Sequence, residues 1–351
     1  MKTPKRLWKA LERIPGLAAV EAQWKAFLGP EYDLSKNFLK PKQQLASSYP
    51  CPNNCGCAHK VITHASDDIV AVCRCEPKRC DTIKITKADI VVYELDWSIL
   101  GNSVTSVLSA LEEDIPVDGL PMTRRIGTYS PYAGFRFPVY LTIQIEPDDF
   151  RQVVDALLTS EDGPFILLAP TYDICRPQSE KLLQKRKATF FPLSDVLVWD
   201  GNGKFIGARP AEEILADFRA SVLPASNDTS SMVFFPTPPD AKWRDVSICF
   251  KDGHNVSVKV KTAKGTFNFT QMGMVNRKSG NPTRQWELLS NFADGKGTLD
   301  WNSTHASPRN QKRREVLATN LKAFFRIEGD PFSLTDDSKG WQARFKISHE
   351  E

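Results

Sequence analysis

Six of the chain's 8 cysteines lie between residues 51 and 80, in two closely spaced groups. The groups are Cys51, Cys55, Cys57 and Cys73, Cys75, Cys80. Thiolates spaced in this way suit a tetrahedral zinc ion, because each tight turn presents neighbouring sulfurs to one ion. The residues between the groups predict a hairpin, with strands at 60–63 and 69–72, that brings the two turns together. His59 is the runner-up ligand.

The ligand set leaves the stoichiometry open. Six thiolates exceed the four that one ion needs. Either two ions share bridging thiolates, or one ion binds four of the cysteines and the other two pack against the site without binding metal. Reduced or disulfide-bonded thiols are the alternative without metal. A redox-active pair is disfavoured because no Cys-x-x-Cys follows a strand and opens a helix, and the many thiolates argue against a catalytic zinc with an open position. Residues 51–80 resemble a zinc ribbon or knuckle, which implies one or two structural Zn²⁺ ions.

The sequence lacks the motifs that would identify an enzyme. It has no phosphate-binding loop, no Gly-x-Gly-x-x-Gly, no Gly-x-Ser-x-Gly and no His-Glu-x-x-His. Glu146, Asp148 and Asp149 form the best carboxylate group, but acidic residues that open a helix usually interact with its dipole. We expect no catalysis. A nucleic-acid enzyme with a carboxylate site at these residues is an alternative.

Charge is distributed unevenly along the chain. Residues 91–240 carry 12 Lys and Arg against 21 Asp and Glu, whereas residues 241–351 carry 19 against 12. A basic C-terminal third beside an acidic middle is typical of a protein in which one domain meets a polyanion. No run reaches the ~18 apolar residues of a membrane span, and the basic N-terminus lacks the apolar core of a signal peptide. We expect a cytoplasmic protein without a membrane partner, whose thiols stay reduced.

The secondary structure predicted along the chain, which must position these residues, indicates a multidomain α+β protein. Apolar spacing predicts helices over 4–30 and again from 86 to 111. Beyond residue 116, strands at 127–130, 135–145, 164–170 and 190–199 alternate with helices at 148–158, 179–188 and 210–222, which favours a three-layer α/β domain with a mainly parallel sheet. The predicted domains are a helical region 1–50, a zinc module 51–85, a helical segment 86–115, an acidic α/β domain 116–222, a linker 223–240 rich in Pro, Ser and Thr, and a C-terminal domain 241–351.

The C-terminal domain is predicted to open with a hairpin over 246–260 and a strand at 266–269. Helices follow at 271–278, 283–292 and 309–325, and the last is introduced by Ser307-Pro308, a helix start signal. This helix is expected to bury Val316, Leu317, Leu321 and Phe324 and to expose its basic first turns. A hairpin over 331–334 and 341–347 closes the domain.

This order of elements resembles the winged-helix DNA-binding domain of the OmpR/PhoB-type regulators. The run Arg314, Leu317, Leu321, Phe325, Asp330-Pro-Phe, Gly340-Trp341 and Phe345 is similar to that family's recognition helix and wing. The resemblance covers residues 241–351 and implies a helix in the major groove of duplex DNA. It implies helix contacts from Arg309, Asn310, Lys312, Arg313 and Arg314, and wing contacts from Lys339 and Arg344.

These observations lead to one main hypothesis and one further rival. We expect a zinc-containing, bacterial-type regulatory protein whose winged helix binds duplex DNA and whose α/β domain senses a ligand or docks a protein partner. The α/β domain departs from that family's phospho-acceptor receiver, because its strand at 164–170 is followed by Thr171 and not by an aspartate. The rival is a non-catalytic recognition subunit of a larger complex, such as a mobile-element or defence complex, that uses the same modules to dock proteins.

Overall fold

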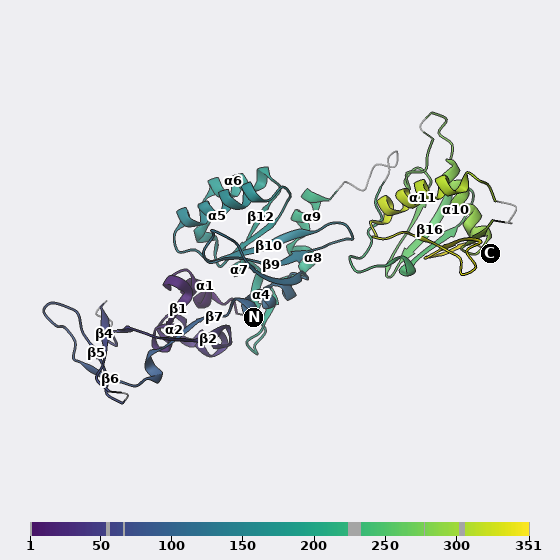
Figure 1. Cartoon of the computed structure of the whole chain (residues 1–351). Coiled ribbons are helices and arrows are strands. Elements are labelled where there is room, and N and C mark those ends of the chain that lie inside the picture. Colours follow the sequence, from purple (N-terminus) through teal and green to yellow (C-terminus); the bar gives the residue numbers. More distant parts are fainter. Residues whose placement is uncertain are drawn as a thin grey trace. The chain divides into compact units, whose positions relative to one another are not determined.

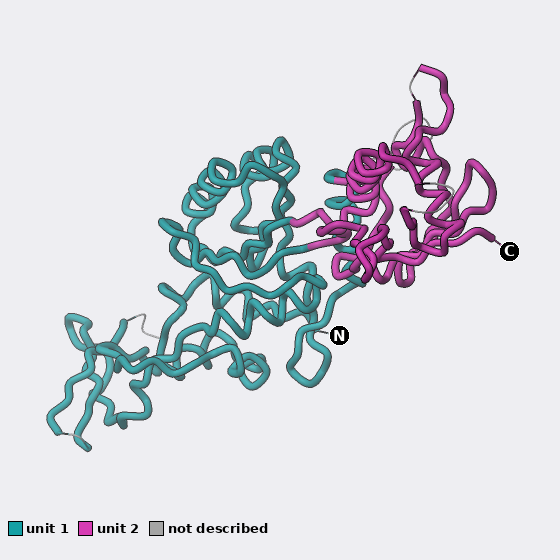
Figure 2. Tube along the Cα trace, turned by 45° about the vertical axis from the view of Figure 1, so that its right-hand side comes forward, with its two compact units in different colours: residues 1–129, 137–222 teal, residues 130–136, 223–351 magenta. Residues whose placement is uncertain are grey.

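The computed structural model describes residues 2–53, 57–65, 67–223, 233–276, 278–301 and 306–350. The chain divides into two compact units, one made of residues 1–129 and 137–222 and the other of residues 130–136 and 223–351 (Figure 2). Both units combine helices with β-sheets, so the predicted multidomain α+β class is confirmed. In the described part of the chain, no helix is both long enough and apolar enough to cross a membrane.

The main sheet of unit 1 has five strands in the order β12-β11-β10-β9-β8 (Figure 1). The strands are β8 (Leu111–Pro116), β9 (Thr123–Tyr129), β10 (Phe137–Thr142), β11 (Ile166–Ala169) and β12 (Thr189–Pro192). Strands β10, β11 and β12 run parallel, but β8, β9 and β10 pair antiparallel. The prediction of a mainly parallel sheet was therefore wrong. Helices connect strands only after β10, and parallel neighbours require such a crossover.

Helices cover both faces of this sheet. Helix α5 (Pro147–Ser160) buries Phe150 and Val154 against the face that carries Tyr140 and Leu167. Helix α6 (Pro177–Lys185) lies beside it (Figure 1). Helix α4 (Trp97–Val107) contacts Ile126, which points away from the Tyr140 face because Tyr140 is paired with its neighbour Arg125. The helix–sheet–helix arrangement agrees with the predicted layers.

The N-terminal part of unit 1 is less helical than predicted. Helices α1 (Lys5–Leu11) and α2 (Glu21–Leu28) form, but the segment after Ile90 is strand β7 (Val91–Leu95), which pairs with β1 (Ala18–Val20) and β2 (Leu39–Leu45). Its Val-Val-Tyr sequence has high β-propensity, and this outweighs the helical spacing. The pairing also explains why the predicted segments 1–50 and 86–115 are not separate bodies.

Shorter elements complete the body of unit 1. The strand predicted at 190–199 is interrupted by a helical turn, and the helix predicted at 210–222 is divided at Leu215. These elements are α3 (Tyr32–Ser35), α7 (Leu193–Val196), β13 (Leu197–Trp199), β14 (Phe205–Gly207), α8 (Ala211–Ile214) and α9 (Ala216–Val222).

The cysteine-rich segment of unit 1 forms its own four-stranded antiparallel sheet. The strands are β3 (Ser48–Pro50), β4 (Ala58–Thr63), β5 (Ile69–Val72) and β6 (Ile83–Ile85), in that order. The paired residues of the β4–β5 hairpin, 60–63 and 69–72, are those predicted, although β4 itself begins two residues earlier, at Ala58. The hydrophobic cluster buried beneath the four-stranded sheet is small and consists of Ile69, Ala71, Ile85 and Ile90.

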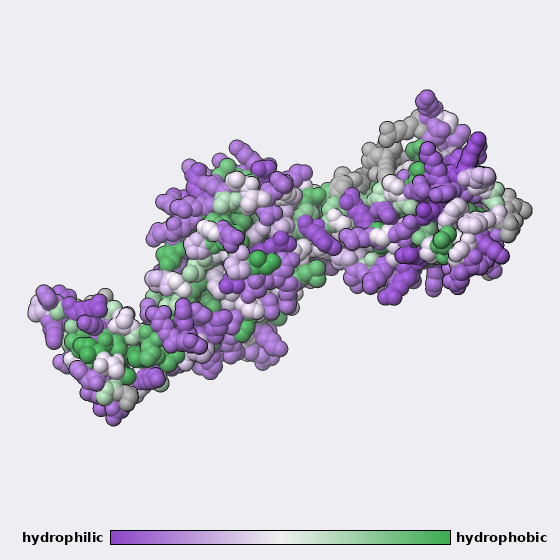
Figure 3. Space-filling model, in the orientation of Figure 1, coloured by the Kyte–Doolittle hydropathy of each residue, from purple (hydrophilic) through white to green (hydrophobic). Residues whose placement is uncertain are grey.

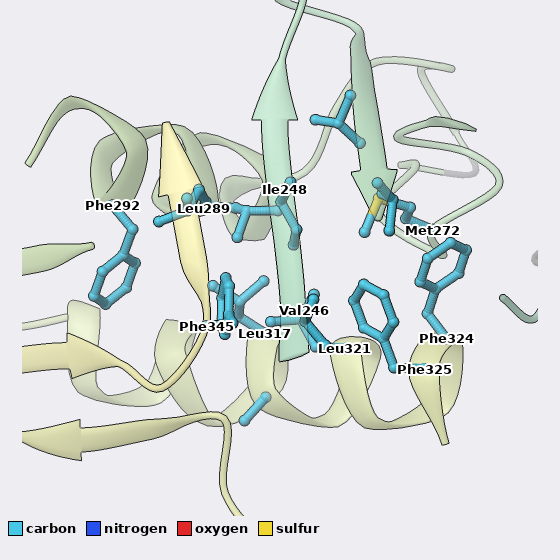
Figure 4. Close-up of a cluster of buried hydrophobic side chains, with 14 of the residues drawn as sticks. Val246, Ile248, Met272, Leu289, Phe292, Leu317, Leu321, Phe324, Phe325 and Phe345 are labelled. Atoms are coloured by element: carbon cyan, nitrogen blue, oxygen red, sulfur yellow. The ribbon is translucent and has the colours of Figure 1, made fainter. Parts of the chain in front are cut away.

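Unit 2 packs two helices against a four-stranded sheet. The sheet has the order β17-β16-β15-β21, with β15 (Val246–Phe250), β16 (Asn255–Val260), β17 (Ala263–Asn268) and β21 (Lys346–His349). Helix α11 (Asn310–Phe325) presents Leu317, Leu321 and Phe325 to Val246 and Ile248 of β15 (Figure 4). Helix α10 (Arg284–Asp294) adds Leu289 and Phe292 to the same core. A second sheet, β18-β20-β19, consists of β18 (Thr298–Asp300), β19 (Phe332–Leu334) and β20 (Gly340–Ala343).

The predicted linker was wrong over its described part. Residues 224–232 lie outside the described residues, but 233–240 pack onto unit 2. Phe235 is buried against Phe267, Phe324 and Phe325, and its N–H donates to the carbonyl of Phe324 at 2.8 Å. The Pro-rich composition predicts a flexible linker, but burial of the Phe235 ring holds this segment on unit 2.

Unit 2 also departs from the predicted winged-helix order. The described residues of the predicted helix 271–278 form turns and an isolated β-bridge at Val275. Helix α11 begins at Asn310 because Pro308 and Arg309 form a preceding turn, which the Asn310 N–H closes on the Ser307 carbonyl. Two of the three expected helices are therefore present in the described residues. The hairpin after α11 is β19–β20 alone, since β21 leaves it to pair in parallel with β15. The structure does contain the predicted opening hairpin, β15–β16, and a hairpin directly after the long basic helix.

Candidate functional site

The cysteine groups meet as two pairs of sulfur atoms. Sγ of Cys51 lies 3.4 Å from Sγ of Cys80, and Sγ of Cys57 lies 3.7 Å from Sγ of Cys73. A disulfide would place its sulfurs at ~2.05 Å, whereas two thiolates on one tetrahedral zinc lie ~3.8 Å apart for Zn–S bonds of ~2.3 Å. Each pair therefore has the separation of two ligands on one ion. In each pair, one cysteine comes from before the β4–β5 hairpin and one from after it.

His59 lies between the two pairs. Its ring nitrogens complete one group with Cys51 and Cys80 and another with Cys57 and Cys73, with all ligand atoms of a group within 4.8 Å of one another. The His59 side chain is fully buried, and neither Nδ1 nor Nε2 has a hydrogen-bond partner among the described residues. A buried polar group without a partner is costly. A metal ion would satisfy one of these nitrogens, so this histidine, a runner-up in the sequence, is a central member of the site.

The surroundings of the cysteine thiols shift their pKa values and favour the thiolate form at Cys73. Backbone N–H groups of Cys75 and Arg79 lower the pKa of the Cys73 thiol to about 6. Hydrogen bonds to the Cys57 and Cys73 sulfurs hold the proton of Cys75 and raise its pKa to about 12, and repulsion between neighbouring thiolates acts in the same direction. A bound cation relieves that repulsion and deprotonates its ligands. The donor set therefore fits a thiophilic divalent ion.

The structure brings together five of the six predicted cysteine ligands. Cys51, Cys57, Cys73 and Cys80 belong to the groups that could hold a metal ion, and Cys75 adjoins the second group. Cys55 lies outside the described residues. Around the site, half-buried apolar side chains of β4 and β5 remain at the surface, and Figure 3 shows hydrophobic residues gathered over this module. A bound metal ion would add stability to a sheet with so small a core.

The basic residues predicted on the last helix have different environments. Arg309 and Lys312 are exposed and have no acidic partner in the part of the chain that the structure describes, and Arg313 is half-buried. Lys339 and Arg344 are exposed on the hairpin and just after it. These five remain candidates for phosphate contact.

Two predicted contact residues are not exposed. Asn310 is buried to 2% exposure. The Arg314 side chain is 17% exposed, and its Nη1 donates to Oδ2 of Asp330 at 3.0 Å. The prediction that both face solvent was wrong, because the helical period places positions 310, 314 and 317 on the packed side. Conversely, Val316 was predicted in the core but is 41% exposed. It precedes Leu317 in the sequence, and one residue along the helix turns its side chain away from the packed side.

A groove of about 1010 Å³ runs between the first turns of α11 and the start of α10. Arg309, Lys312, Arg313 and Arg284 line it, and the one acidic residue of the described lining, Glu287, pairs with Arg284. Val316 lies in the same wall. The remaining lining is mostly amide or hydroxyl side chains, from Asn276, Ser279, Asn281, Thr283 and Gln285.

Sequence reasoning missed the α10 side of this groove. The residues come from the end of one predicted helix, 271–278, the loop after it and the start of the next, 283–292, and their approach to α11 depends on long-range packing. An Asn- and Ser-rich turn before a helix that starts with arginine was the available signal. The assembled groove suits phosphate oxygens and base edges, which accept hydrogen bonds from such groups.

The carboxylates considered for catalysis do not converge. Asp148 lies at the start of α5, 73% exposed, and pairs with Arg176 at 2.7 Å. Among the described residues, Glu146, Asp148 and Asp149 do not form a group that could hold a metal ion. Their geometry is that of a solvated helix start.

No known protein family, curated protein or solved structure matches the chain.

Proposed function

We propose that this protein is a zinc-stabilised, non-catalytic DNA-binding protein that contacts duplex DNA through the groove between α10 and α11. The observation that carries this proposal is the groove lining, in which Arg309 and Lys312 are exposed and lack acidic partners among the described residues. A lysine or arginine that is already paired with a carboxylate contributes little to DNA binding. An unpaired one neutralises a phosphate and releases the counterion that was bound to the DNA there.

The residues of the groove support duplex contact in two ways. Its arginines and lysine are suited to phosphate oxygens, and the amides of Asn276, Asn281 and Gln285 are suited to base edges or phosphates. Val316 adds an exposed apolar group of the kind that contacts a thymine methyl. The β19–β20 hairpin follows α11, as a wing follows a recognition helix in the OmpR/PhoB-type domain, and places Lys339 on its turn.

The metal in this proposal is zinc with a structural role. Cys51, Cys80, Cys57, Cys73 and His59 would hold it, and zinc is the ion that thiolate and imidazole ligands most commonly bind at structural sites. Bound zinc neutralises the thiolates and joins both ends of the β4–β5 hairpin. The buried His59 leaves little access for a substrate.

The protein-docking alternative is favoured by the edge strand β8. Leu111 and Ile115 on this strand are 66% and 51% exposed, and an exposed apolar sheet edge is a common site of pairing with another chain. This surface belongs to unit 1 and is compatible with DNA contact by unit 2. It is the best candidate for the partner-docking role of the α/β domain.

The test uses the full-length chain and a fluorescent 20-bp duplex of random sequence. Binding is measured by anisotropy over a series of salt concentrations. We expect the logarithm of the association constant to fall linearly with the logarithm of salt, with a slope of about −3 for three phosphate contacts. Absence of duplex binding at low salt would reject DNA binding and favour the docking alternative.

A further inference from the structure

A second cavity lies at the start of α11 and is lined by two tryptophans. It has a volume of about 440 Å³, within the ~300–1,000 Å³ range of small-molecule sites. Trp301 follows β18 and is 51% exposed, and Trp341 lies on β20. Their ring centroids are 6.3 Å apart and the planes are inclined at 69°. Leu299 and Pro308 extend this apolar wall.

The two tryptophans are held by different means. The N–H of Trp301 donates to the carbonyl of Lys339 at 2.9 Å, which fixes the backbone beneath its exposed ring. Trp341 pairs with Leu299 across the β18–β20 ladder, and the Arg314 guanidinium lies 6.0 Å from its ring centroid. The cavity thus has preformed aromatic walls on a sheet.

The opposite side of the cavity is polar. Ser307 and Gln311 contribute a hydroxyl and an amide at the start of α11, beside the buried amide of Asn310, and Asp300 contributes a carboxylate. An aromatic wall facing amides suits a nucleobase, which stacks through its ring and forms hydrogen bonds through its edge. The described lining residues include no lysine or arginine that could hold a phosphate group, so the neutral base and not the backbone is the part that fits.

The cavity adjoins the basic groove. Pro308 lines both, so a strand whose phosphates meet Arg309 and Lys312 passes directly beside the cavity. We propose that the Trp301–Trp341 cavity binds the base of one unpaired nucleotide in a DNA strand whose adjacent duplex occupies the groove. The protein would then prefer duplex ends with an overhang, or duplexes with an extrahelical base, to continuous duplex. This inference rests on the proposed function, because the groove supplies the neighbouring phosphate contacts.

The experiment compares two labelled probes with the full-length protein: a blunt 20-bp duplex and the same duplex with a 3-nucleotide adenine overhang. We expect the overhang to tighten binding by roughly 5- to 100-fold, the range that stacking of one base provides. Trp301→Ala should abolish this preference and leave the affinity for the blunt duplex unchanged. Trp301→Phe should restore much of it, because an aromatic ring still stacks. Trp301 is suited to this change because its side chain is largely exposed.

Equal affinity of the wild-type protein for both probes would overturn the inference, as would a preference that survives in Trp301→Ala. Adenosine monophosphate is titrated separately. If it competes for the cavity as strongly as the overhang does, the ligand is a free nucleotide and the assignment to a DNA strand is wrong. Failure of the proposed function is distinguishable, because it removes blunt-duplex binding, whereas failure of this inference removes only the difference between the probes.

Discussion

Arg314 of α11 and Asp330, two residues before β19, form an ion pair with Nη1 and Oδ2 at 3.0 Å. The pair ties the basic helix to the hairpin that follows it. Asp330 also accepts the N–H of Phe332 at 3.0 Å through its other oxygen. The arginine that the sequence suggests as a DNA contact therefore joins α11 to the hairpin and lies over the ring of Trp341.

We predict that Arg314→Ala lowers the free energy of unfolding by about 1–3 kcal/mol, because it leaves Asp330 without its charged partner. Arg309→Ala is the matched control, since Arg309 is exposed and has no acidic partner in the described residues. Urea unfolding of both variants measures the difference. Equal stability of Arg314→Ala and Arg309→Ala would mean that the ion pair does not tie α11 to the hairpin.

The same pair predicts a dependence on pH. Burial raises the pKa of Asp330, but the Phe332 N–H and the Arg314 guanidinium outweigh it and hold the pKa below its ordinary value. A lowered folded pKa stabilises the fold above the unfolded pKa of ~3.9, and this stabilisation is lost as pH falls through the folded value. Asp330→Asn should therefore be less stable than the wild type at pH 7, and the difference should shrink as pH falls below about 4. A difference that stays constant from pH 7 to pH 3 would show that ionisation of Asp330 is not its source.

Val316 and Leu317 provide a test of the corrected face of α11. Leu317 is fully buried, so Leu317→Ala should cost about 2–5 kcal/mol of stability. Val316→Ala should change stability by less than about 1 kcal/mol, because surface changes usually have small effects, and should weaken duplex binding through lost contact in the groove. Thermal unfolding and anisotropy measure the two effects. Unfolding of Val316→Ala would restore the original placement of Val316 in the core.

Zinc binding is tested at His59. Purified wild-type protein should contain one or two zinc ions per chain by elemental analysis, and a strong chelator should destabilise the β3–β6 module. His59→Ala should reduce the zinc content, because it removes the ligand common to both cysteine groups. His64→Ala is the matched control, since His64 is exposed and lies outside those groups. Full zinc content in folded His59→Ala protein would contradict the role of this histidine.

The sequence predicts those parts of the fold that depend on local pattern. Long amphipathic helices such as α5, α10 and α11 and the β4–β5 hairpin lie close to their predicted bounds, because their hydrophobic period is sustained. The segment Val91–Leu95 is too short for its period to distinguish helix from strand, and its pairing with β1 and β2 decides the outcome. The two antiparallel pairs of the main sheet likewise depend on the absence of a crossover helix before β10.

The candidate site follows the same division. Cysteine spacing is a local signal, and the structure brings the described cysteines together. The importance of His59 depends on its burial without a partner, which spacing does not reveal. The roles of Arg314 and Asn310 depend on which side of α11 packs, and the Trp301–Trp341 cavity depends on β18 pairing with β20, 40 or so residues later in the sequence. Contacts between distant segments are set by tertiary packing, so no local pattern in the sequence predicts them.

Binding of one duplex to two charge-matched triple variants tests the central claim most directly. The first, Arg309→Ala/Lys312→Ala/Arg313→Ala, removes the cations of the groove. The second, Lys259→Ala/Lys264→Ala/Lys346→Ala, removes three exposed lysines from the four-stranded sheet of the same unit. We predict that the groove variant stays folded, loses most of its affinity and has a salt slope smaller by about three, while the sheet variant binds much as the wild type does. Unchanged binding by the folded groove variant, or an equal loss in both, would contradict the account.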